Sequence, residues 1–135
     1  MRTLLIILFF FITKIYSQSW SQVVDFPGSA RDDATAFSIG DFGYVITGMD
    51  AGFQTTVDGY KYHPYSYIWY PIDTFPAETR QHACGFAING KGYLVGGHGT
   101  GYFNDCWQYD PVLDSWSEMD SIPSFGRSSC GGTGP

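Results

Sequence analysis

The chain has 135 residues, and its 13 Asp and Glu residues outnumber its seven Lys and Arg residues, giving a formal net charge of −6. An acidic balance of this kind argues against nucleic acid or an anionic membrane as partner, because phosphate groups are bound by basic surfaces. Aromatic residues make up 19% of the sequence, and no low-complexity tract or block of like charge indicates disorder, so we expect a folded domain.

Residues 1–19 are typical of a secretory signal peptide. Arg2 supplies a positive charge, residues 4–12 are apolar, and Ser17 and Ser19 are small residues suited to cleavage. The apolar run is much shorter than the roughly 20 residues that a spanning helix needs, and an uncleaved anchor or a core helix is the alternative. We therefore expect a secreted or extracytoplasmic protein with no membrane span after cleavage.

A register of Trp, Pro and Arg occurs three times along the chain. In each set the Trp stands seven residues before the Pro and 11 residues before the Arg. The sets are Trp20, Pro27 and Arg31; Trp69, Pro76 and Arg80; and Trp116, Pro123 and Arg127. Beyond the Arg, residues 43–48 (GYVITG) align with residues 92–97 (GYLVGG). A period of about 50 residues with short strands indicates a propeller or a similar array.

Each full period divides into four short segments that we expect to be strands. They are residues 34–39, 44–47, 59–63 and 68–72 in the first period, and residues 83–88, 93–95, 105–110 and 115–119 in the second. The pair Asn89-Gly90 indicates a tight hairpin, and Pro64 and Pro111 each end a third strand. A four-stranded meander with two apolar faces becomes stable by stacking on copies of itself around an axis.

The second period resembles a Kelch repeat. Gly96 and Gly97 form the double glycine that ends the second strand of that repeat, Tyr109 stands in the third strand, and Trp116 stands in the fourth. These matches recur together at fixed spacing, and each has a structural reason, since glycine permits positive φ and close backbone approach.

The first period resembles the same family with one departure. Tyr62 and Trp69 match the Kelch pattern, but Thr47 and Gly48 replace the double glycine. The resemblance implies an all-β fold, a Kelch-type β-propeller. Only a partial array is expected here, with about two four-stranded blades, a closing outer strand and a stub of a third blade.

The resemblance also implies a division of the chain. Residues 20–30 would be the outer strand of the closing blade with its loop, residues 31–73 the first blade, residues 74–120 the second blade, and residues 121–135 the truncated start of a third. Two blades cannot close a ring of the usual 4–8. We expect the remaining blades to come from a longer chain, with self-association or an array that does not fold alone as alternatives.

Residues that recur in register are interpreted as parts of the architecture, because repetition indicates a shared structural role. Stacking of a sugar on the Trp and Tyr side chains is the alternative for those residues. The architectural set is Trp20, Trp69, Trp116, Tyr62, Tyr109, Gly48, Gly96, Gly97, Arg31, Arg80 and Arg127. For the Arg residues, we favour binding to loop carbonyls or to an acidic neighbour over a role in ligand binding.

Four polar residues are the candidates for a ligand site at the mouth of the propeller channel. In this fold the loops before the first strand and after the second strand share one face, which would bring Asp33, Asp50, His82 and His98 together. Asp33 aligns with His82 at a shift of 49, and Asp50 with His98 at a shift of 48. Convergent polar groups at a concave mouth are a common form of ligand site.

A second candidate surface consists of Tyr65, Tyr67 and Tyr70, at or beside the turn between the third and fourth strands. Exposed tyrosines supply rigid stacking area to a ligand. Aromatic packing across an outer strand is the alternative, and we favour it.

No catalytic residue, metal site or cofactor is indicated by the sequence. It contains no P-loop, no H-E-x-x-H and no nucleophile elbow. The cysteines are odd in number and without metal-ligand spacing, so we expect buried residues rather than a full disulfide set; they are Cys84, Cys106 and Cys130.

A secreted module that binds a protein or a glycan is therefore the expected function. The alternative is the N-terminal part of a Kelch-like carbohydrate-active enzyme that resembles galactose oxidase or sialic-acid epimerase. The copper oxidases of that group need two His, two Tyr and a Cys, and no spacing here assigns His82, His98 and Cys84 to those roles.

Overall fold

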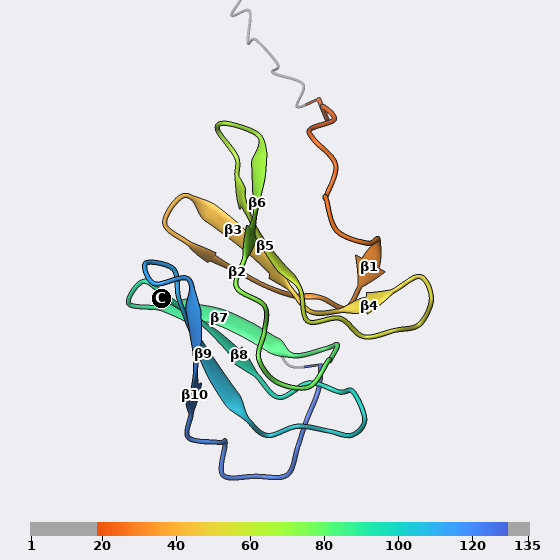
Figure 1. Ribbon diagram of the computed structural model, residues 1–135, viewed down its shortest axis with the longest axis vertical. Helices are drawn as coiled ribbons and strands as arrows, with labels where there is room; N and C mark the ends of the chain where they lie inside the picture. Colours follow the sequence, from red (N-terminus) through yellow and green to blue (C-terminus); the bar gives the residue numbers. More distant parts are fainter. Residues whose placement is uncertain (1–18, 130–135) are drawn as a thin grey trace, which may run out of the picture.

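The computed structural model describes residues 19–129, and all the regular structure in that part is β-strand. Two four-stranded antiparallel sheets and one small two-stranded sheet make up the fold (Figure 1). This arrangement confirms the expected all-β architecture of about two blades. The described residues contain no helix that is long and apolar enough to cross a membrane, and residues 1–18 of the expected signal peptide lie outside the described part.

The first blade has the strand order β2-β3-β5-β6. Its strands are β2 (Thr35–Ile39), β3 (Phe42–Ile46), β5 (Gly59–His63) and β6 (Ile68–Ile72). The bounds of β5 and β6 are those expected from the sequence. Strand β3 begins two residues earlier than expected, because Gly43 continues the ladder between Ser38 and Tyr62 instead of belonging to the turn.

The second blade repeats this order as β7-β8-β9-β10. Its strands are β7 (Cys84–Ile88), β8 (Lys91–Val95), β9 (Cys106–Asp110) and β10 (Ser115–Met119). Asn89 and Gly90 both have positive φ, at 51° and 73°, which is the backbone that a tight two-residue hairpin requires.

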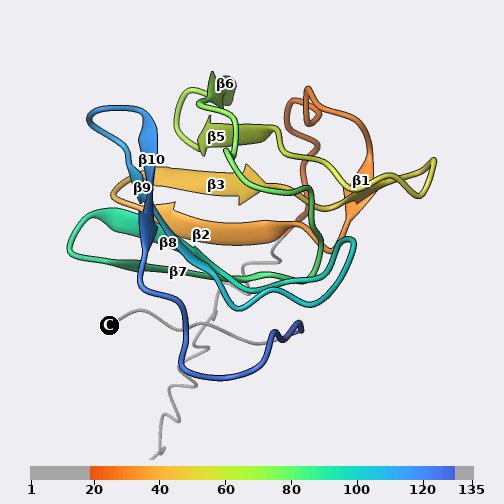
Figure 2. The same cartoon turned by 60° about the horizontal axis from the view of Figure 1, so that its bottom comes forward.

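The main core lies where the two blades pack together. Strands β2 and β7 run side by side, as Figure 2 shows. Phe37 and Tyr44 of the first blade are buried with Leu94 and Tyr109 of the second, and the Tyr44 and Tyr109 rings are 5.6 Å apart. Phe75, from the connection between the blades, completes this cluster. Neither blade could bury these side chains alone, as expected for a repeat array.

A two-stranded sheet at one end of the first blade was not expected. Strand β1 (Arg31–Asp32) pairs with β4 (Met49–Asp50), and the pairing brings the residues before the first blade strand beside the loop that follows its second strand. Strands of two residues have no alternating pattern, so the sequence carries no signal for them.

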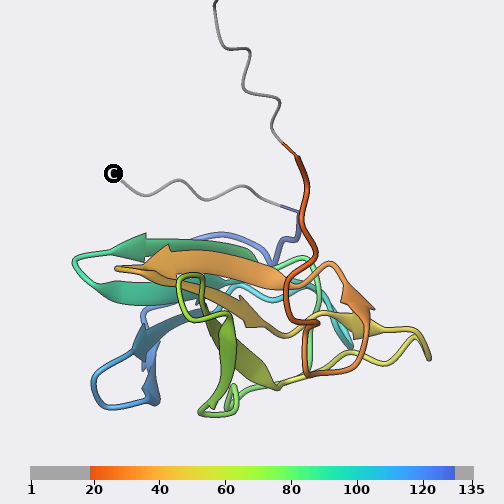
Figure 3. The same ribbon diagram turned by 90° about the horizontal axis from the view of Figure 1, so that it is seen from above.

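The first described residues, before β1, lead away from both blades in Figure 3, whereas Phe26 packs against Tyr60 and Trp69 of the first blade at 5.1 Å. Residues 20–24 form no strand, and the Trp20 side chain is fully exposed. The blade that this segment would complete has no counterpart among residues 19–129, so its assignment as a closing outer strand stays a prediction.

Candidate functional site

The candidate site lies where one turn recurs at the entry to each repeat. Asp33, His82 and Ser129 each stand two residues after a repeat Arg, and each has positive φ, at 51°, 56° and 58°. The His82 amide donates to the Asp33 carbonyl at 2.9 Å, and the Ser129 amide donates to the His82 carbonyl at 2.9 Å. One backbone hydrogen bond therefore links each entry turn to the next.

The same turns bring two predicted ligand residues into contact. His82 Nδ1 lies 3.2 Å from Asp33 Oδ1, and each side chain is 36% exposed. A carboxylate and an imidazole held together at the surface present an acceptor and a ring nitrogen to a ligand. The structure therefore brings together two of the four polar residues that were expected at the channel mouth.

Arg31 stabilises the entry turn of the first blade through its guanidinium group. Its guanidinium donates to the Thr47 carbonyl at 3.0 Å and to both oxygens of Asp58 at 2.7 Å. The hydrogen bond from Arg31 holds the pKa of the Asp58 carboxyl below its usual value. These are the contacts that the structural interpretation of Arg31 requires.

Arg80 makes the equivalent contacts in the second blade, and its side chain is more deeply buried than that of Arg31. It donates to the Gly96 carbonyl at 2.9 Å and to the Asp105 oxygens at 2.6 and 2.9 Å. The guanidinium also lies over the Phe75 ring at 4.8 Å and the Phe103 ring at 4.2 Å. With its side chain 1% exposed, Arg80 is shielded from any ligand.

The repeat glycines are required by the backbone at these turns. Gly48 and Gly97 have φ of 106° and 102°, and a Cβ on either would lie within 3 Å of the carbonyl oxygen of Asp32 or Gln81. Gly96 has φ of 64°, and in the first blade Thr47 takes the same conformation at 59°. Thr47 is fully buried, and its hydroxyl lies 3.3 Å from that of Thr35.

The expected equivalence of Asp50 and His98 is wrong by one residue. Met49 pairs with Asp32, and His98 forms the corresponding bridge with Gln81, so His98 matches Met49 at a shift of 49. A shift of one residue in a strand turns the side chain to the other face. Asp50 instead accepts hydrogen bonds from the Gly52 and Gln54 amides at 2.8 and 3.0 Å, which closes its own loop.

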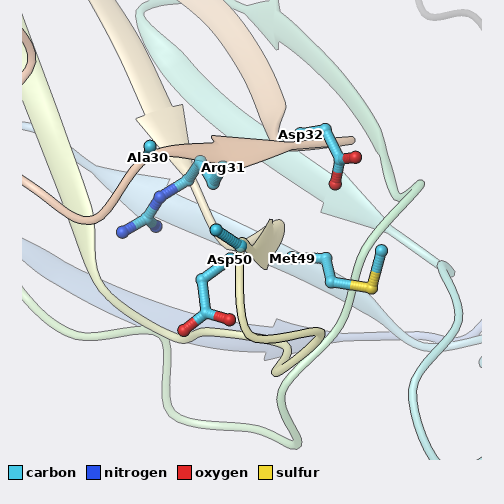
Figure 4. A pocket seen from close by; sticks show the side chains of 6 residues that line it. Ala30, Arg31, Asp32, Met49 and Asp50 are labelled. Carbon is cyan, nitrogen blue, oxygen red and sulfur yellow. The ribbon is translucent and has the colours of Figure 1, made fainter.

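A shallow depression of about 230 Å³ lies over the small sheet, lined by residues of β1 and β4. Figure 4 shows that the Asp32 and Asp50 carboxylates point in different directions and that the Arg31 guanidinium is directed away from both. The depression therefore lacks converging groups, and the Asp33–His82 pair is the stronger centre for a site.

Three exposed aromatic side chains stand in the loops next to the entry turns, and none of them was among the predicted site residues. Phe53 is 80% exposed in the loop after β4, Tyr102 is 65% exposed in the corresponding loop of the second blade, and Phe125 is 93% exposed before the third entry turn. The Tyr102 ring lies 4.8 Å from that of His98. The two loops lie on one side of the molecule, the right of Figure 1. Aromatic residues beside glycine in loops after each second strand were the available signal.

The structure does not bring the tyrosine candidates to this site. Tyr65 and Tyr67 stand in the hairpin between β5 and β6, at the other end of the first blade, and both are exposed. Tyr70 on β6 is also exposed, and its ring lies 6.5 Å from that of Phe42. The two candidate surfaces are therefore separate.

The recurring aromatic residues pack inside the blades. Tyr109 is fully buried, its hydroxyl donates to Asp114 at 2.5 Å, and burial together with this bond raises the pKa of the phenol. Trp116 packs on Tyr109 at 5.1 Å and donates to the Asp73 carbonyl. In the first blade the Tyr62 and Trp69 rings lie 4.7 Å apart.

Arg127 differs from its two counterparts because its side chain is exposed. Its backbone still repeats the pattern, since its amide donates to the Phe103 carbonyl and its carbonyl accepts from Gly97 at 2.8 Å.

The cysteine positions exclude one disulfide. Cys84 and Cys106 both stand opposite Val95, on the two strands that flank β8. Strands two apart in a sheet are separated by more than 9 Å, beyond the reach of a disulfide. Cys84 is buried and Cys106 is half-buried, whereas Cys130 lies outside the described residues. Residues 19–129 contain no group of three potential metal-ligating side chains.

Comparison with known proteins supports the Kelch resemblance. Residues 79–123 match the model of the Kelch motif, so the second blade is a Kelch repeat. The fold matches the solved structure of YjhT, a Kelch-type propeller protein, with a TM-score of 0.72 and 21% sequence identity. The match covers 82% of this chain and 44% of the YjhT chain, so this chain spans less than half the length of that structure. No curated protein sequence matches the chain.

Proposed function

We propose that the chain is a Kelch-repeat interaction module that binds a protein ligand through the loop face around Asp33 and His82. The observation that carries the proposal is the contact of these two side chains across the blades, on turns that the Arg residues and glycines hold in place. A site on a rigid scaffold loses little entropy when it binds, which favours affinity.

The exposed loop aromatics favour a protein as the ligand. Phe53, Tyr102 and Phe125 offer large apolar area beside polar groups, and such residues are enriched where proteins bind one another. A glycan is the second candidate, and the Tyr102 ring packed beside His98 is the feature that favours it, since an aromatic ring can stack on a sugar.

Binding can be measured with the mature chain, residues 20–135, immobilised and probed with a panel of purified extracellular proteins and with a glycan array. For a bound protein, we expect His82→Ala and Tyr102→Ala each to weaken binding by about tenfold or more, as hot-spot residues do. The matched control is Val112→Ser, which alters an exposed apolar residue in a hairpin away from the loop face. We expect it to bind as the wild type does.

A ligand found only on the glycan array would replace the protein class with a glycan. Equal loss of binding in Val112→Ser and His82→Ala would contradict the placement of the site on the loop face. A chain that binds none of the probes would contradict the function itself.

We also propose that the chain is exported, with residues 1–19 acting as the signal peptide. The support is the charged start and the short apolar run of that segment. Expression with the native leader should release protein into the medium with its N-terminus at or near Trp20, which N-terminal sequencing would show. Retention of an intact Met1 inside the cell would contradict export.

A further inference from the structure

The hairpin between β5 and β6, at the top of Figure 1, carries a cluster of aromatic side chains that reaches the surface. Tyr65 is 78% exposed in the turn, and Tyr70 is 39% exposed on β6. The Tyr65 ring lies 5.8 Å from that of His63, which lies 4.9 Å from the Phe42 ring. The Phe42 ring in turn lies 6.5 Å from that of Tyr70. These four residues form one continuous surface, here called the hairpin platform.

The second blade has the same hairpin without the platform. At the shift of 47 that relates the two hairpins, Tyr65 and Tyr70 correspond to Val112 and Ser117. Residues that serve the architecture of a repeat recur in register. The exposed tyrosines occur in one blade alone of the two, so the blade fold does not require them.

The turn also holds a tyrosine in an unfavourable backbone conformation. Tyr67 is exposed and has φ of 58°, and Asp114, at the same position of the second hairpin, has φ of 49°. Asp tolerates this left-handed region, whereas a bulky side chain is rarely found there. The first blade thus keeps an exposed tyrosine at a conformational cost, and residues in such conformations concentrate at functional sites.

Hydrogen-bonding groups accompany the rings of the platform. The Ser66 amide donates to His63 Nδ1 at 3.2 Å. Because an amide N–H can only donate, Nδ1 is the acceptor, and the neutral imidazole carries its proton on Nε2. Lys61 Nζ lies 5.4 Å from the centre of the Phe42 ring. The platform therefore combines ring faces with phenol, imidazole and ammonium donors.

We propose that the hairpin platform is a glycan-binding site, separate from the loop face, on which a pyranose ring stacks against the exposed tyrosines. A pyranose has C–H groups on its faces and hydroxyls at its rim, so it matches aromatic faces that are accompanied by donors and acceptors. Every side chain from Tyr65 to Tyr67 is exposed and carries a hydroxyl, which can both donate to and accept from a sugar.

A protein ligand matches the platform less well. The centre of a protein interface is depleted of Ser and of charged groups, whereas Ser66 stands in the middle of this turn and Lys61 lies over the Phe42 ring. Tyrosine rings lose little conformational entropy on binding, which suits a small ligand that buries little area.

The proposal can be tested by titrating labelled residues 20–135 with lactose, cellotetraose and chitotetraose and recording NMR spectra. At least one of these sugars should shift the signals of His63, Tyr65 and Tyr70. Tyr65→Ala and Tyr70→Ala should each weaken that binding by about tenfold, the effect expected when one aromatic contact is lost. Tyr65→Phe should retain most of the affinity, because it keeps the ring.

Val112→Ala is the matched control, because Val112 is exposed at the position of Tyr65 in the second hairpin. It should bind the sugar as the wild type does, and so should His82→Ala, which alters the loop face alone. Amide spectra that are unchanged outside the hairpin would show that the variants fold.

The proposal would be overturned if none of the three sugars shifted the platform signals, or if Val112→Ala lost as much affinity as Tyr65→Ala. Loss of sugar binding in His82→Ala with full binding in Tyr65→Ala would place the sugar on the loop face instead. A protein ligand that depends on Tyr65, together with no response to the sugars, would assign the platform to a protein.

Discussion

Removal of the Asp105 carboxylate should be among the most damaging single changes in the second blade. The guanidinium of Arg80 is almost completely shielded from water, and Asp105 supplies its only counter-charge in direct contact among the described residues. In Asp105→Ala the Arg80 guanidinium would stay buried and charged. Only the carbonyls of Gly96 and Glu78 and two aromatic rings would then contact it among the described residues.

Breaking a buried ion pair from one side costs about 3–5 kcal/mol, because an uncompensated charge is left behind. The Trp107 indole, which donates to Asp105 at 2.9 Å, would lose its acceptor as well. The matched substitution Asp58→Ala should cost less, about 1–3 kcal/mol, because the Asp58 side chain is 40% exposed and Arg31 keeps the Thr47 carbonyl and the Thr56 hydroxyl.

Urea unfolding of residues 20–135, followed by tryptophan fluorescence, measures both losses. With a slope of about 1.5 kcal/mol/M, the midpoint of Asp105→Ala should fall by about 2–3 M. A midpoint within 0.5 M of the wild type (about 0.8 kcal/mol on that slope) would show that Arg80 does not depend on the Asp105 carboxylate, and a larger loss in Asp58→Ala would contradict the greater burial cost in the second blade.

Three further predictions concern the blade interface and the dependence of stability on pH. A Cβ at Gly85 would lie 2.6 Å from the Ala36 carbonyl oxygen, so Gly85→Ala should lower the free energy of unfolding by about 1–3 kcal/mol through overpacking. Gly43→Ala, where a Cβ meets no atom within 4 Å, should change it little. Similar values for the two variants in urea unfolding would contradict the close approach of Gly85 to the first blade. The hydrogen bond from Arg31 lowers the pKa of Asp58, so the ion pair stabilises the fold above the ordinary pKa of the carboxyl and this stabilisation is lost as pH falls. Asp58→Asn should therefore lose less stability than the wild type between pH 5 and pH 3. An unchanged acid profile would count against the ion pair. Burial raises the pKa of Tyr109, so the protonated phenol stabilises the fold below its ordinary pKa of about 10 and this stabilisation is lost as pH rises. Tyr109→Phe should lower the free energy of unfolding by about 1 kcal/mol at neutral pH and should lose less stability at alkaline pH than the wild type. An identical alkaline profile would exclude Tyr109 as the source of that loss.

Much of the fold could be predicted from the sequence because its signals are local and repeated. The Trp, Pro and Arg register fixes the outer strands, so β5, β6 and β10 have the expected bounds. The starts of β3 and β8 were missed because glycine favours a turn locally, while the ladder on both sides extends the strand through Gly43 and Gly92. In each case tertiary pairing overrides the local preference.

The candidate site was predicted only in part. The repeat alignment placed Asp33 and His82 at equivalent entry turns, whereas the direct contact of their side chains was not predicted. The expected equivalence of Asp50 and His98 was wrong because the loops after the second strands differ in length. His98 corresponds instead to Met49, one residue before Asp50. The loop aromatics Phe53 and Tyr102 are 49 residues apart, which is the shift that relates the two blades, but they were missed because the alignment was not followed into these loops.

Residue-resolved amide hydrogen exchange of residues 20–135 by NMR tests most directly whether successive repeats are linked through their entry turns. This link positions the loop face. The His82 and Ser129 amides should be protected, because each donates to the preceding turn. Exchange of both amides as fast as that of the exposed loop residue Thr100 would contradict it.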